Sequence, residues 1–457
     1  MTGPDDNVGQ QVSSLNKTQR DAVGSFLDGW DGGDRSFLLP IVEGPPGTGK
    51  TTVGVLGAAR YVLENPKAKV AYVAYTNYAA ENAREKFQSL GFSAAEVIRL
   101  TPEYEEKNWA KGVVGCRSNL EDLTPENKRA IHQAKVLIST IYSSGRIFSQ
   151  FRRPLIMIDE FSQVMPPMFF YLISKVANTS DASGGYNPSG YALLGDPNQL
   201  PVITSQPLLR PNIGNFLLAR KRDLESHELT VQYRMHSAIC EAVNALREAL
   251  NTYPLKSASD VERRDMRLLG FSYDSSRLAS PLDEVLSPHH PLVMIDTESL
   301  PGQEYAGLDQ SKCYDEEARM AAHLATALHQ SYNAADGRKL DPVILSPYSG
   351  QVGLIKKHLG VKSLREDSFT VYKSQGREYP AVVVSFVRKN DQGNIGFLGE
   401  PQLRAQTYVA CSRAKAKLIL LFSFRTFRGN LDFGTLLEWC GAKALVVKGS
   451  DLWGLVS

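Results

Sequence analysis

The sequence predicts an α/β protein with parallel sheets that are covered by helices on both faces. Short runs rich in β-branched residues are apolar throughout, which is typical of strands buried on both faces. These runs alternate with amphipathic segments, and this alternation favours parallel strands joined by helices. The 457 residues are long enough for two to three domains. The pattern starts again near residue 220, which predicts a second α/β domain.

Composition places the chain among ordinary globular proteins. Charged residues make up 22% and hydrophobic residues 42% of the sequence, and the net charge is only +2. Any contact with nucleic acid must therefore come from a local groove, because the overall field is weak. The five cysteines form no C-x-x-C pair, the start is polar, and no apolar run approaches the roughly 20 residues of a membrane helix. We expect an intracellular protein, cytoplasmic or nuclear, without membrane contact.

The first half alternates between expected strands and expected helices. Residues 1–14 are polar and predict a flexible N-terminus, which an amphipathic helix at Leu15–Leu27 follows. A polar helical region is expected at about 92–134, and Asn178–Gly190 has the composition of a loop. The strands of this first domain, 15–225, are predicted before Gly44, at 70–75, 136–140 and 154–160, and in the run that ends at Asp196.

The second half, 226–457, predicts a second α/β domain. A helix begins within VQYRMHSAICEAVNAL, and residues 251–290 are polar and irregular. No glycine-rich turn like that of the first half is present in this half. Its strands are predicted at 292–296, 342–346, 370–372, 381–387 and 417–423.

The stretch IVEGPPGTGKTT, residues 41–52, has the pattern of a strand end, a glycine-rich turn and a helix start. It fits G-x-x-x-x-G-K-[ST], the phosphate-binding loop, in which backbone N–H groups and the helix N-terminus surround a phosphate. Lys50 is expected to reach the β and γ phosphates, and the Thr51 hydroxyl to ligate Mg²⁺. A chance glycine-rich turn is the alternative. The predicted nucleotide-binding residues here are Gly44, Pro45, Pro46, Gly47, Thr48, Gly49, Lys50, Thr51 and Thr52.

Three further candidate side chains lie at or just after the carboxyl ends of predicted strands, where α/β sheets place their ligands. Asp159 is expected to hold Mg²⁺ together with Thr51, and Glu160 to polarise the attacking water. Gln199 in GDPNQLP is positioned to sense a γ-phosphate. Taken alone, the two acids could be a solvated strand end and GDPNQLP an ordinary turn.

The second domain contributes two candidate arginines, Arg234 in QYRMH and Arg413 in VACSRAK. A domain without its own phosphate-binding loop but with such arginines predicts fingers that complete the site of the first domain. For each arginine alone, an ion pair or a surface position is the alternative.

Seven ordered motifs, GPPGTGKT, DEFSQ, GDPNQLP, QYRMH, SPYSGQ, SQGRE and CSRAK, resemble those of superfamily-1 helicases. The resemblance covers roughly residues 15–425 and is strongest to the up-frameshift (nonsense-mediated decay) and senataxin-like group. It implies two tandem RecA-like parallel-sheet domains with the ATP site in the cleft between them, and ATP with Mg²⁺ as cofactors.

The resemblance also implies roles for individual residues. Gln19 would contact adenine and Tyr233 would stack on it. Gln199, Arg234, Gly376, Glu378 and Arg413 would close the nucleotide site, with Lys50, Asp159 and Glu160 in the catalytic roles given above. The residues implied to contact a single nucleic-acid strand are Thr76, Asn77, Ser139, Thr140, Ser346, Tyr348 and Thr370.

The sequence departs from the up-frameshift pattern in two places. Tyr372, Lys373 and Ser374 replace the usual residues before Gln375, and this stretch is closer to RecD-like DNA helicases. Phe161 stands where the relatives have a small residue. We also expect no zinc-rich regulatory domain or β-barrel insertion before Gln19.

The leading hypothesis is an ATP-driven helicase or translocase that moves 5′-to-3′ on single-stranded RNA or DNA, as the resemblance implies. An ATP-gated clamp that remodels RNA–protein complexes without processive unwinding is the alternative, and an inactive scaffold is disfavoured because every expected phosphate-site residue is present. RNA and DNA are not distinguished, because no residue indicates a 2′-OH contact. We expect a monomer whose partner is a single nucleic-acid strand, with further protein partners unidentified.

Overall fold

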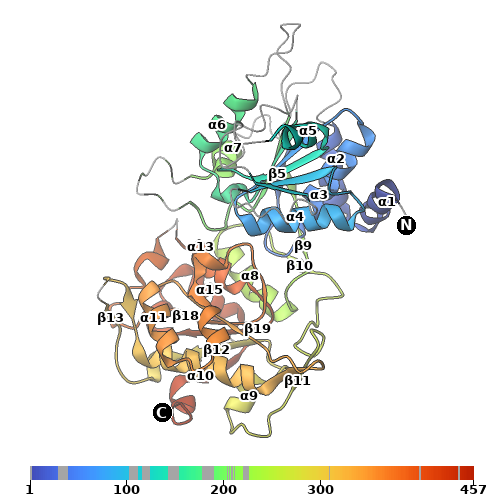
Figure 1. Cartoon of the computed structure of the whole chain (residues 1–457). Coiled ribbons are helices and arrows are strands. Elements are labelled where there is room, and N and C mark those ends of the chain that lie inside the picture. Colours follow the sequence, from blue (N-terminus) through green and yellow to red (C-terminus); the bar gives the residue numbers. More distant parts are fainter. Residues whose placement is uncertain are drawn as a thin grey trace. The chain divides into compact units, whose positions relative to one another are not determined.

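The chain forms two compact units, Met1–Leu229 and Thr230–Ser457, each built around one parallel sheet (Figure 1). The sequence-based prediction places the boundary between residues 225 and 226. The computed structural model describes residues 3–28, 40–101, 112–115, 124–142, 154–177, 190–202, 204, 206, 209, 211–219, 226–307, 309–400, 403–440 and 443–456. The predicted loop Asn178–Gly190, apart from Gly190, and Cys116 lie outside these residues.

Unit 1 contains an eight-stranded parallel sheet in the order β4-β3-β5-β2-β6-β7-β1-β8. The strands predicted in this half are confirmed as β1, β2, β5, β6 and β7. The bounds are β1 Ile41–Glu43, β2 Val70–Ala74, β3 Val97–Thr101, β4 Val113–Gly115, β5 Val136–Thr140, β6 Leu155–Asp159, β7 Tyr191–Gly195 and β8 Ser226–Glu228.

Side chains alternate between two apolar layers on the faces of this sheet, as the pleat of a strand requires. Val70, Tyr72 and Ala74 of β2 join one layer with α1 to α4, whereas Ala71 and Val73 join the opposite layer with α5 to α7. The helices are α1 Pro4–Ser14, α2 Lys17–Asp28, α3 Lys50–Glu64, α4 Asn77–Ser89, α5 Pro125–Gln133, α6 Pro166–Ala177 and α7 Ile213–Leu218, with a 3₁₀ turn, η4, at Phe161–Gln163.

Two segments of unit 1 differ from the sequence-based prediction. Residues 4–14 form helix α1, with Val8 buried, where a flexible N-terminus was expected. The prediction of a helical region at 92–134 is wrong for β3 and β4, although α5 lies within it. The centre of β3 carries Arg99, which is paired with Glu81 of α4 at 2.5 Å, so this strand lacks the continuous apolar run used to recognise strands.

Unit 2 contains a six-stranded parallel sheet in the order β17-β16-β18-β19-β12-β20. The predicted strands of this half are confirmed, although β17 lies two residues before the expected 370–372. The sheet strands are β12 Leu292–Asp296, β16 Val343–Ser346, β17 Ser368–Thr370, β18 Tyr379–Ser385, β19 Ala414–Phe422 and β20 Leu445–Lys448. Smaller pairs are formed by β9 Val231–Gln232, β10 Lys256–Ser257, β11 Phe271–Tyr273, β13 Tyr305–Ala306, β14 Lys312–Cys313 and β15 Tyr332–Ala334.

Helices cover the sheet of unit 2, and α10 packs against α11 (Figure 1). They are α8 Ser237–Ala249, α9 Leu282–Leu286, α10 Asp315–Ser331, α11 Ser349–His358, α12 Lys362–Glu366, α13 Ala405–Cys411, α14 Phe424–Phe427, α15 Leu431–Cys440 and α16 Gly449–Trp453, with 3₁₀ turns η7 Thr297–Ser299, η8 Val371–Ser374 and η9 Gly396–Gly399. Among the helices of the described residues, none has the length and apolar character that crossing a membrane requires.

Candidate functional site

The loop between β1 and α3 has the backbone of a phosphate-binding loop. Gly47 and Gly49 have φ angles of 81° and 84°, in the left-handed region that glycine adopts without strain. A Cβ on Gly44 would lie 2.2 Å from Cγ of Lys50, so the Lys50 side chain runs back across this glycine. Lys50 is buried, and the Thr48 hydroxyl donates to the Pro45 carbonyl across the loop at 2.7 Å.

The two acids lie beside this loop because β6 ends next to β7, and β7 next to β1. The Thr51 hydroxyl donates to Oδ2 of Asp159 at 3.1 Å, and Nζ of Lys50 lies 3.9 Å from Oε1 of Glu160. Glu160 has a φ of 60°, a strained conformation for a residue with a side chain. Its Oε2 is buried and has no hydrogen-bond partner among the described residues. The structure therefore brings Lys50, Thr51, Asp159 and Glu160 together, as the motifs predict.

This arrangement suits Mg²⁺ held together with a bound nucleotide. Asp159 and Thr51 present adjacent oxygens, the ligand type that this hard cation takes. The described residues contain no group of three or more His, Cys, Asp or Glu that could hold a metal alone. Mg²⁺ commonly uses one or two protein oxygens plus phosphates and water rather than a protein cage. Burial, and then the neighbouring charge of Glu160, raise the pKa of the Asp159 carboxyl, an effect that a bound cation would oppose.

Tyr72 also belongs to this site, although it lies in none of the sequence motifs. Its hydroxyl donates to Oδ2 of Asp159 at 2.8 Å, the same oxygen that Thr51 contacts. The side chain is fully buried, and burial raises its pKa well above the ordinary value. The only sequence signal is a tyrosine in an otherwise small and aliphatic strand, VAYVA.

The two predicted glutamines are both buried at the edges of this site. Nε2 of Gln19 donates to the Thr48 carbonyl at 2.9 Å, and its Oε1 accepts from the backbone of Asn16. Gln19 therefore braces the phosphate-binding loop, and its predicted contact with adenine stays a prediction. Gln199 lies just after β7, where its backbone N–H donates to the carbonyl of Asp196 at 3.1 Å.

Phe161, one of the residues that depart from the up-frameshift pattern, fits into space left by two glycines. A Cβ on Gly195 would lie 2.6 Å from the Phe161 ring, and one on Gly214 only 2.0 Å. The ring is fully buried between the end of β7 and the start of α7. The glycines at 195 and 214 thus leave room for a large residue directly after the two acids.

The two candidate arginines of unit 2, Arg234 and Arg413, each form hydrogen bonds with other residues of that unit. Nε of Arg234 donates to Glu378 at 2.6 Å, and its Nη1 to the Ser412 carbonyl at 3.1 Å. Burial would raise the pKa of Glu378, but the charges of Arg234 and Lys415 outweigh it and lower the pKa to about 2. Gly376, two residues before, has a φ of 76°. Tyr233, whose stacking on adenine stays a prediction, accepts a hydrogen bond from Arg264 through its carbonyl.

Arg413 is buried, with 2% of its surface exposed. Its guanidinium donates to the carbonyls of Val409 and Arg377, each at 3.1 Å, and to the Ser412 hydroxyl at 3.0 Å. Arg413 is therefore held by acceptors within unit 2, whereas 14% of the Arg234 side chain is exposed, and the finger role of both residues stays a prediction.

The predicted nucleic-acid contacts divide into exposed and buried groups. Thr76 and Asn77 are exposed at the N-terminus of α4, where the Thr76 hydroxyl accepts from the N–H of Ala79 at 3.1 Å. Thr370 is half-buried. The other four, Ser139, Thr140, Ser346 and Tyr348, are buried. Their hydroxyls are therefore less accessible to a nucleic-acid strand than those of the exposed residues.

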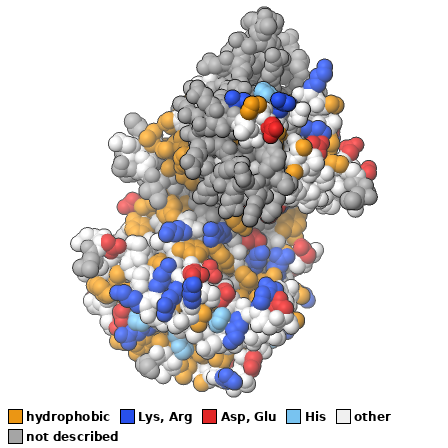
Figure 2. All heavy atoms as spheres, viewed as in Figure 1, with side chains coloured by type: hydrophobic (Ala, Val, Ile, Leu, Met, Phe, Trp, Pro, Cys, Tyr) orange, Lys and Arg blue, Asp and Glu red, His pale blue; other side chains and the backbone are white. Residues whose placement is uncertain are grey.

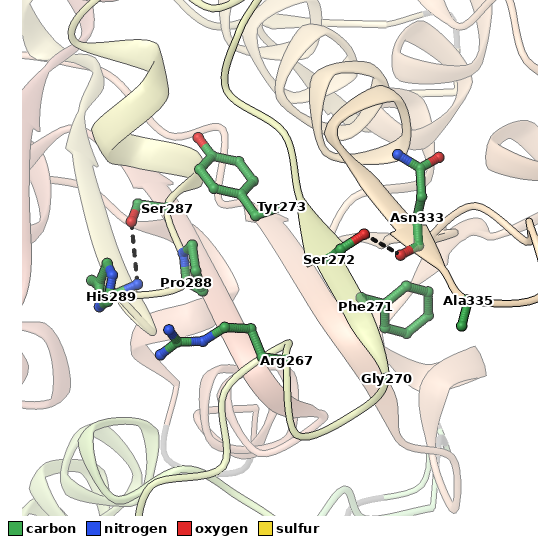
Figure 3. Close-up of a pocket in the computed structure, with 10 residues that line it drawn as sticks. All are labelled: Arg267, Gly270, Phe271, Ser272, Tyr273, Ser287, Pro288, His289, Asn333 and Ala335. Carbon is green, nitrogen blue, oxygen red and sulfur yellow. Dashed lines mark hydrogen bonds between the residues drawn. The ribbon is translucent and has the colours of Figure 1, made fainter.

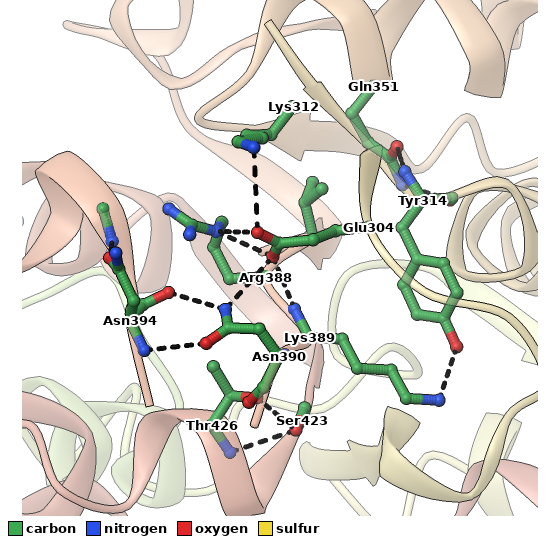
Figure 4. Close-up of polar contacts among 12 residues, drawn as sticks. Glu304, Lys312, Tyr314, Gln351, Arg388, Lys389, Asn390, Asn394, Ser423 and Thr426 are labelled. Carbon is green, nitrogen blue, oxygen red and sulfur yellow. Dashed lines mark hydrogen bonds and ion pairs between the residues drawn. The ribbon is translucent and has the colours of Figure 1, made fainter. Parts of the chain in front are cut away.

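A polar network around Glu304 holds the turn that follows β18 (Figure 4). Arg388 and Glu304 form a buried ion pair at 2.7 Å, and Glu304 also accepts from the backbone N–H of Lys389. The Tyr348 ring lies 4.7 Å from that of Phe397. Tyr348 is thus packed against Phe397, and its contact with a nucleic-acid strand stays a prediction.

Unit 2 also contains a pocket of about 660 Å³ between β11 and the segment at residues 287–289 (Figure 3). None of the predicted site residues lines it. Its lining is Arg267, Gly270, Phe271, Ser272, Tyr273, Ser287, Pro288, His289, Asn333 and Ala335.

The fold and the phosphate site are those of a P-loop nucleotide-binding protein, and the chain carries helicase motifs. Comparison with known proteins agrees: one family model described as "AAA domain" matches residues 38–205, and a second of the same description matches residues 216–424. The chain is 28% identical over 469 residues to "DNA replication ATP-dependent helicase/nuclease DNA2" of Mus musculus, covering 97% of this chain and 40% of that protein. The predicted resemblance to superfamily-1 helicases is thereby confirmed.

Relatives of the up-frameshift and senataxin-like kind are found as well. "Regulator of nonsense transcripts 1" of Dictyostelium discoideum is 24% identical, over 96% of this chain and 33% of that protein. "DNA-binding protein SMUBP-2" of Mesocricetus auratus is 24% identical, over 93% of this chain and 44% of that protein. Among solved structures, an arterivirus helicase with DNA overlaps with a TM-score of 0.44 at 16% identity, covering 91% of this chain and 65% of that one. The chain thus spans less than half the length of these curated relatives.

Proposed function

We propose that this chain is an ATP-dependent helicase or translocase that acts on single-stranded nucleic acid, with 5′-to-3′ polarity. The observation that carries the proposal is the cluster of Lys50, Thr51, Asp159 and Glu160 at the carboxyl edge of the unit 1 sheet. The AAA-domain models over both units, and relatives named as helicases, support it.

In the proposed reaction, Lys50 and the backbone of the loop bind the β and γ phosphates of ATP. Mg²⁺, held by Thr51 and Asp159, would neutralise charge on the phosphate oxygens. Glu160 orients and polarises the attacking water through Oε2, the buried oxygen that lacks a protein partner. Gln199 senses the γ-phosphate. Arg234 and Arg413 stabilise charge on the transferring phosphoryl group, with Glu378 positioning Arg234.

The protein would bind the phosphates and sugars of the single nucleic-acid strand, with Thr76 and Asn77 as the exposed contacts of unit 1. Lys and Arg side chains gather on the visible face of unit 2 in Figure 2, which supplies local positive charge despite the small net charge of +2. Because phosphate contacts release counterions, binding should weaken as salt rises. We propose that the protein acts as a monomer inside the cell.

The proposal is tested by ATPase and strand-displacement assays run in parallel on the whole chain. We expect hydrolysis to be slow alone, to rise with homopolymer RNA or DNA, and to lose this stimulation between about 50 and 200 mM salt. Duplexes with a 5′ or a 3′ overhang test polarity, and Glu160→Gln is the matched inactive control. An ATPase rate indifferent to every polynucleotide at low salt would refute the proposal.

One result of these assays would favour the alternative function, an ATP-gated clamp that remodels RNA–protein complexes without processive unwinding. Stimulated ATPase and ATP-dependent strand binding without displacement from either overhang would indicate a protein that remodels complexes rather than unwinding duplexes.

A further inference from the structure

Tyr72 lies on β2 and links Asp159, beside the phosphate-binding loop, to the part of the chain that leads to the proposed nucleic-acid contacts Thr76 and Asn77. Its hydroxyl and that of Thr51 both donate to Oδ2 of Asp159, at 2.8 and 3.1 Å. The other oxygen, Oδ1, accepts the backbone N–H of Glu160 at 3.0 Å. Three donors from three different segments therefore fix the orientation of one carboxylate.

Close neighbours on both sides leave the Tyr72 side chain little room to move away from Asp159. Gly54 of α3 faces it, and a Cβ there would lie 3.2 Å from the hydroxyl oxygen and 3.4 Å from Cε2 of the ring. A larger residue at 54 would press on the tyrosine. On the other side, the Phe87 ring of α4 contacts the Tyr72 ring edge-on, with centroids 6.3 Å apart.

Strand β2, which carries Tyr72, leads directly to the predicted nucleic-acid contacts Thr76 and Asn77. β2 ends at Ala74, Thr76 caps α4, and α4 carries Phe87 against Tyr72. A polar link joins α4 to the first turn of α3, directly after the phosphate-binding loop, because Nζ of Lys86 donates to the Thr52 hydroxyl at 2.8 Å. A displacement of β2 and α4 would therefore move donors on both Asp159 and Thr52.

We propose that Tyr72 is a positioning residue that orients Asp159 for Mg²⁺ and, together with Lys86, couples strand binding at Thr76 and Asn77 to ATP hydrolysis. The coupling rests on the proposed function, whereas the orientation of Asp159 does not. Partners that orient a metal ligand typically contribute 10- to 100-fold in metal affinity.

The first experiment measures metal affinity without turnover. Mn²⁺ binding in the presence of ADP is followed by electron paramagnetic resonance for the parent, Tyr72→Phe and Tyr61→Phe. Tyr61, buried in the same apolar layer on α3, is the matched control. We expect Tyr72→Phe to weaken Mn²⁺ binding roughly 10-fold or more, with Tyr61→Phe at the parent value. Equal Mn²⁺ affinity in all three proteins overturns the positioning role.

The second experiment measures coupling as the ratio of ATPase rates with and without single-stranded oligonucleotide. We expect the ratio to fall in Tyr72→Phe and also in Lys86→Met, which leaves Asp159 and its donors intact and should keep parent Mn²⁺ affinity. A ratio at the parent value in both variants overturns the coupling. A parent that shows no stimulation refutes the proposed function and the coupling together, while the Mn²⁺ measurement still decides whether Tyr72 orients Asp159. Lys86→Met also keeps the coupling testable if Tyr72→Phe lowers the melting temperature.

Discussion

The ring of Phe161 occupies the space that Gly214 leaves open, since a Cβ on Gly214 would lie 2.0 Å from Cε2 of that ring. Phe161 directly follows Glu160, and Gly214 lies in the first turn of α7. The position of the proposed catalytic acid therefore depends on a helix more than 50 residues away in the sequence. A large residue after the acids is compatible with the site because distant glycines make room for it.

This contact predicts that Gly214→Ala will destabilise unit 1 and lower ATP turnover. Overpacking a filled core typically costs about 1–3 kcal/mol, and displacement of Phe161 would also move Glu160. Urea unfolding and ATPase rates should be compared for Gly214→Ala in the parent and in a Phe161→Leu background. We expect the alanine to cost less when residue 161 is smaller. An equal cost in both backgrounds would show that the two residues do not interact.

Lys50 and Glu160 should separate nucleotide binding from hydrolysis. Lys50→Ala removes the cation that is expected to contact the β and γ phosphates, so ATP affinity should fall. Glu160→Gln should bind ATP normally but hydrolyse it roughly 10²–10⁴-fold more slowly, because an amide does not act as a base. Fluorescent-nucleotide titration and turnover measure the two effects. Hydrolysis by Glu160→Gln at the parent rate would assign the catalytic role to another acid.

Arg413→Ala should lower nucleic-acid-stimulated hydrolysis by 10³–10⁵-fold if Arg413 acts as a finger, the range typical of such residues. Because the guanidinium also donates to Val409, Arg377 and Ser412, we expect the melting temperature to fall as well. Turnover and ATP affinity are therefore measured well below the melting temperature. Arg234→Ala is the matched variant, since its side chain is less enclosed and should affect turnover with a smaller loss of stability. Near-parent turnover in folded Arg413→Ala would leave that residue a purely structural role.

Glu317, buried on α10, should make the stability of unit 2 depend on pH. Burial raises its pKa to about 7, although hydrogen bonds from Ser385, Val387 and Thr297 partly offset this effect. Because the folded pKa exceeds the unfolded value, the contribution is fully present below the unfolded pKa and is lost as pH rises through about 7.

The loss should amount to about 3 kcal/mol between pH 4.5 and 7, and Glu317→Gln should remove this part of the pH dependence. Thermal unfolding of the two proteins from pH 4 to 8 provides the measurement. Parallel pH profiles would mean that Glu317 does not titrate in this window.

The sequence alone determined the class of the fold and the nucleotide chemistry. Strands buried on both faces are continuous apolar runs, and the phosphate loop is a contiguous stretch whose glycines and Lys50 are required by local backbone geometry. Such features depend on neighbours in the chain, so they can be predicted from it. The carboxyl-edge positions of Asp159, Glu160 and Gln199 follow from the same logic, because parallel strands end at a common edge.

Only the tertiary structure decided which side chains support these residues. Tyr72 reaches Asp159 across two neighbouring strands, and the space for Phe161 comes from Gly195 and Gly214. Strand β3 was missed because Arg99 interrupts its apolar run, and Glu81, which pairs with that arginine, lies on another element. Likewise, the Arg377 carbonyl that accepts from Arg413 lies 36 positions away in the sequence. These contacts join residues distant in the chain, and local propensity and periodicity contain no information about them.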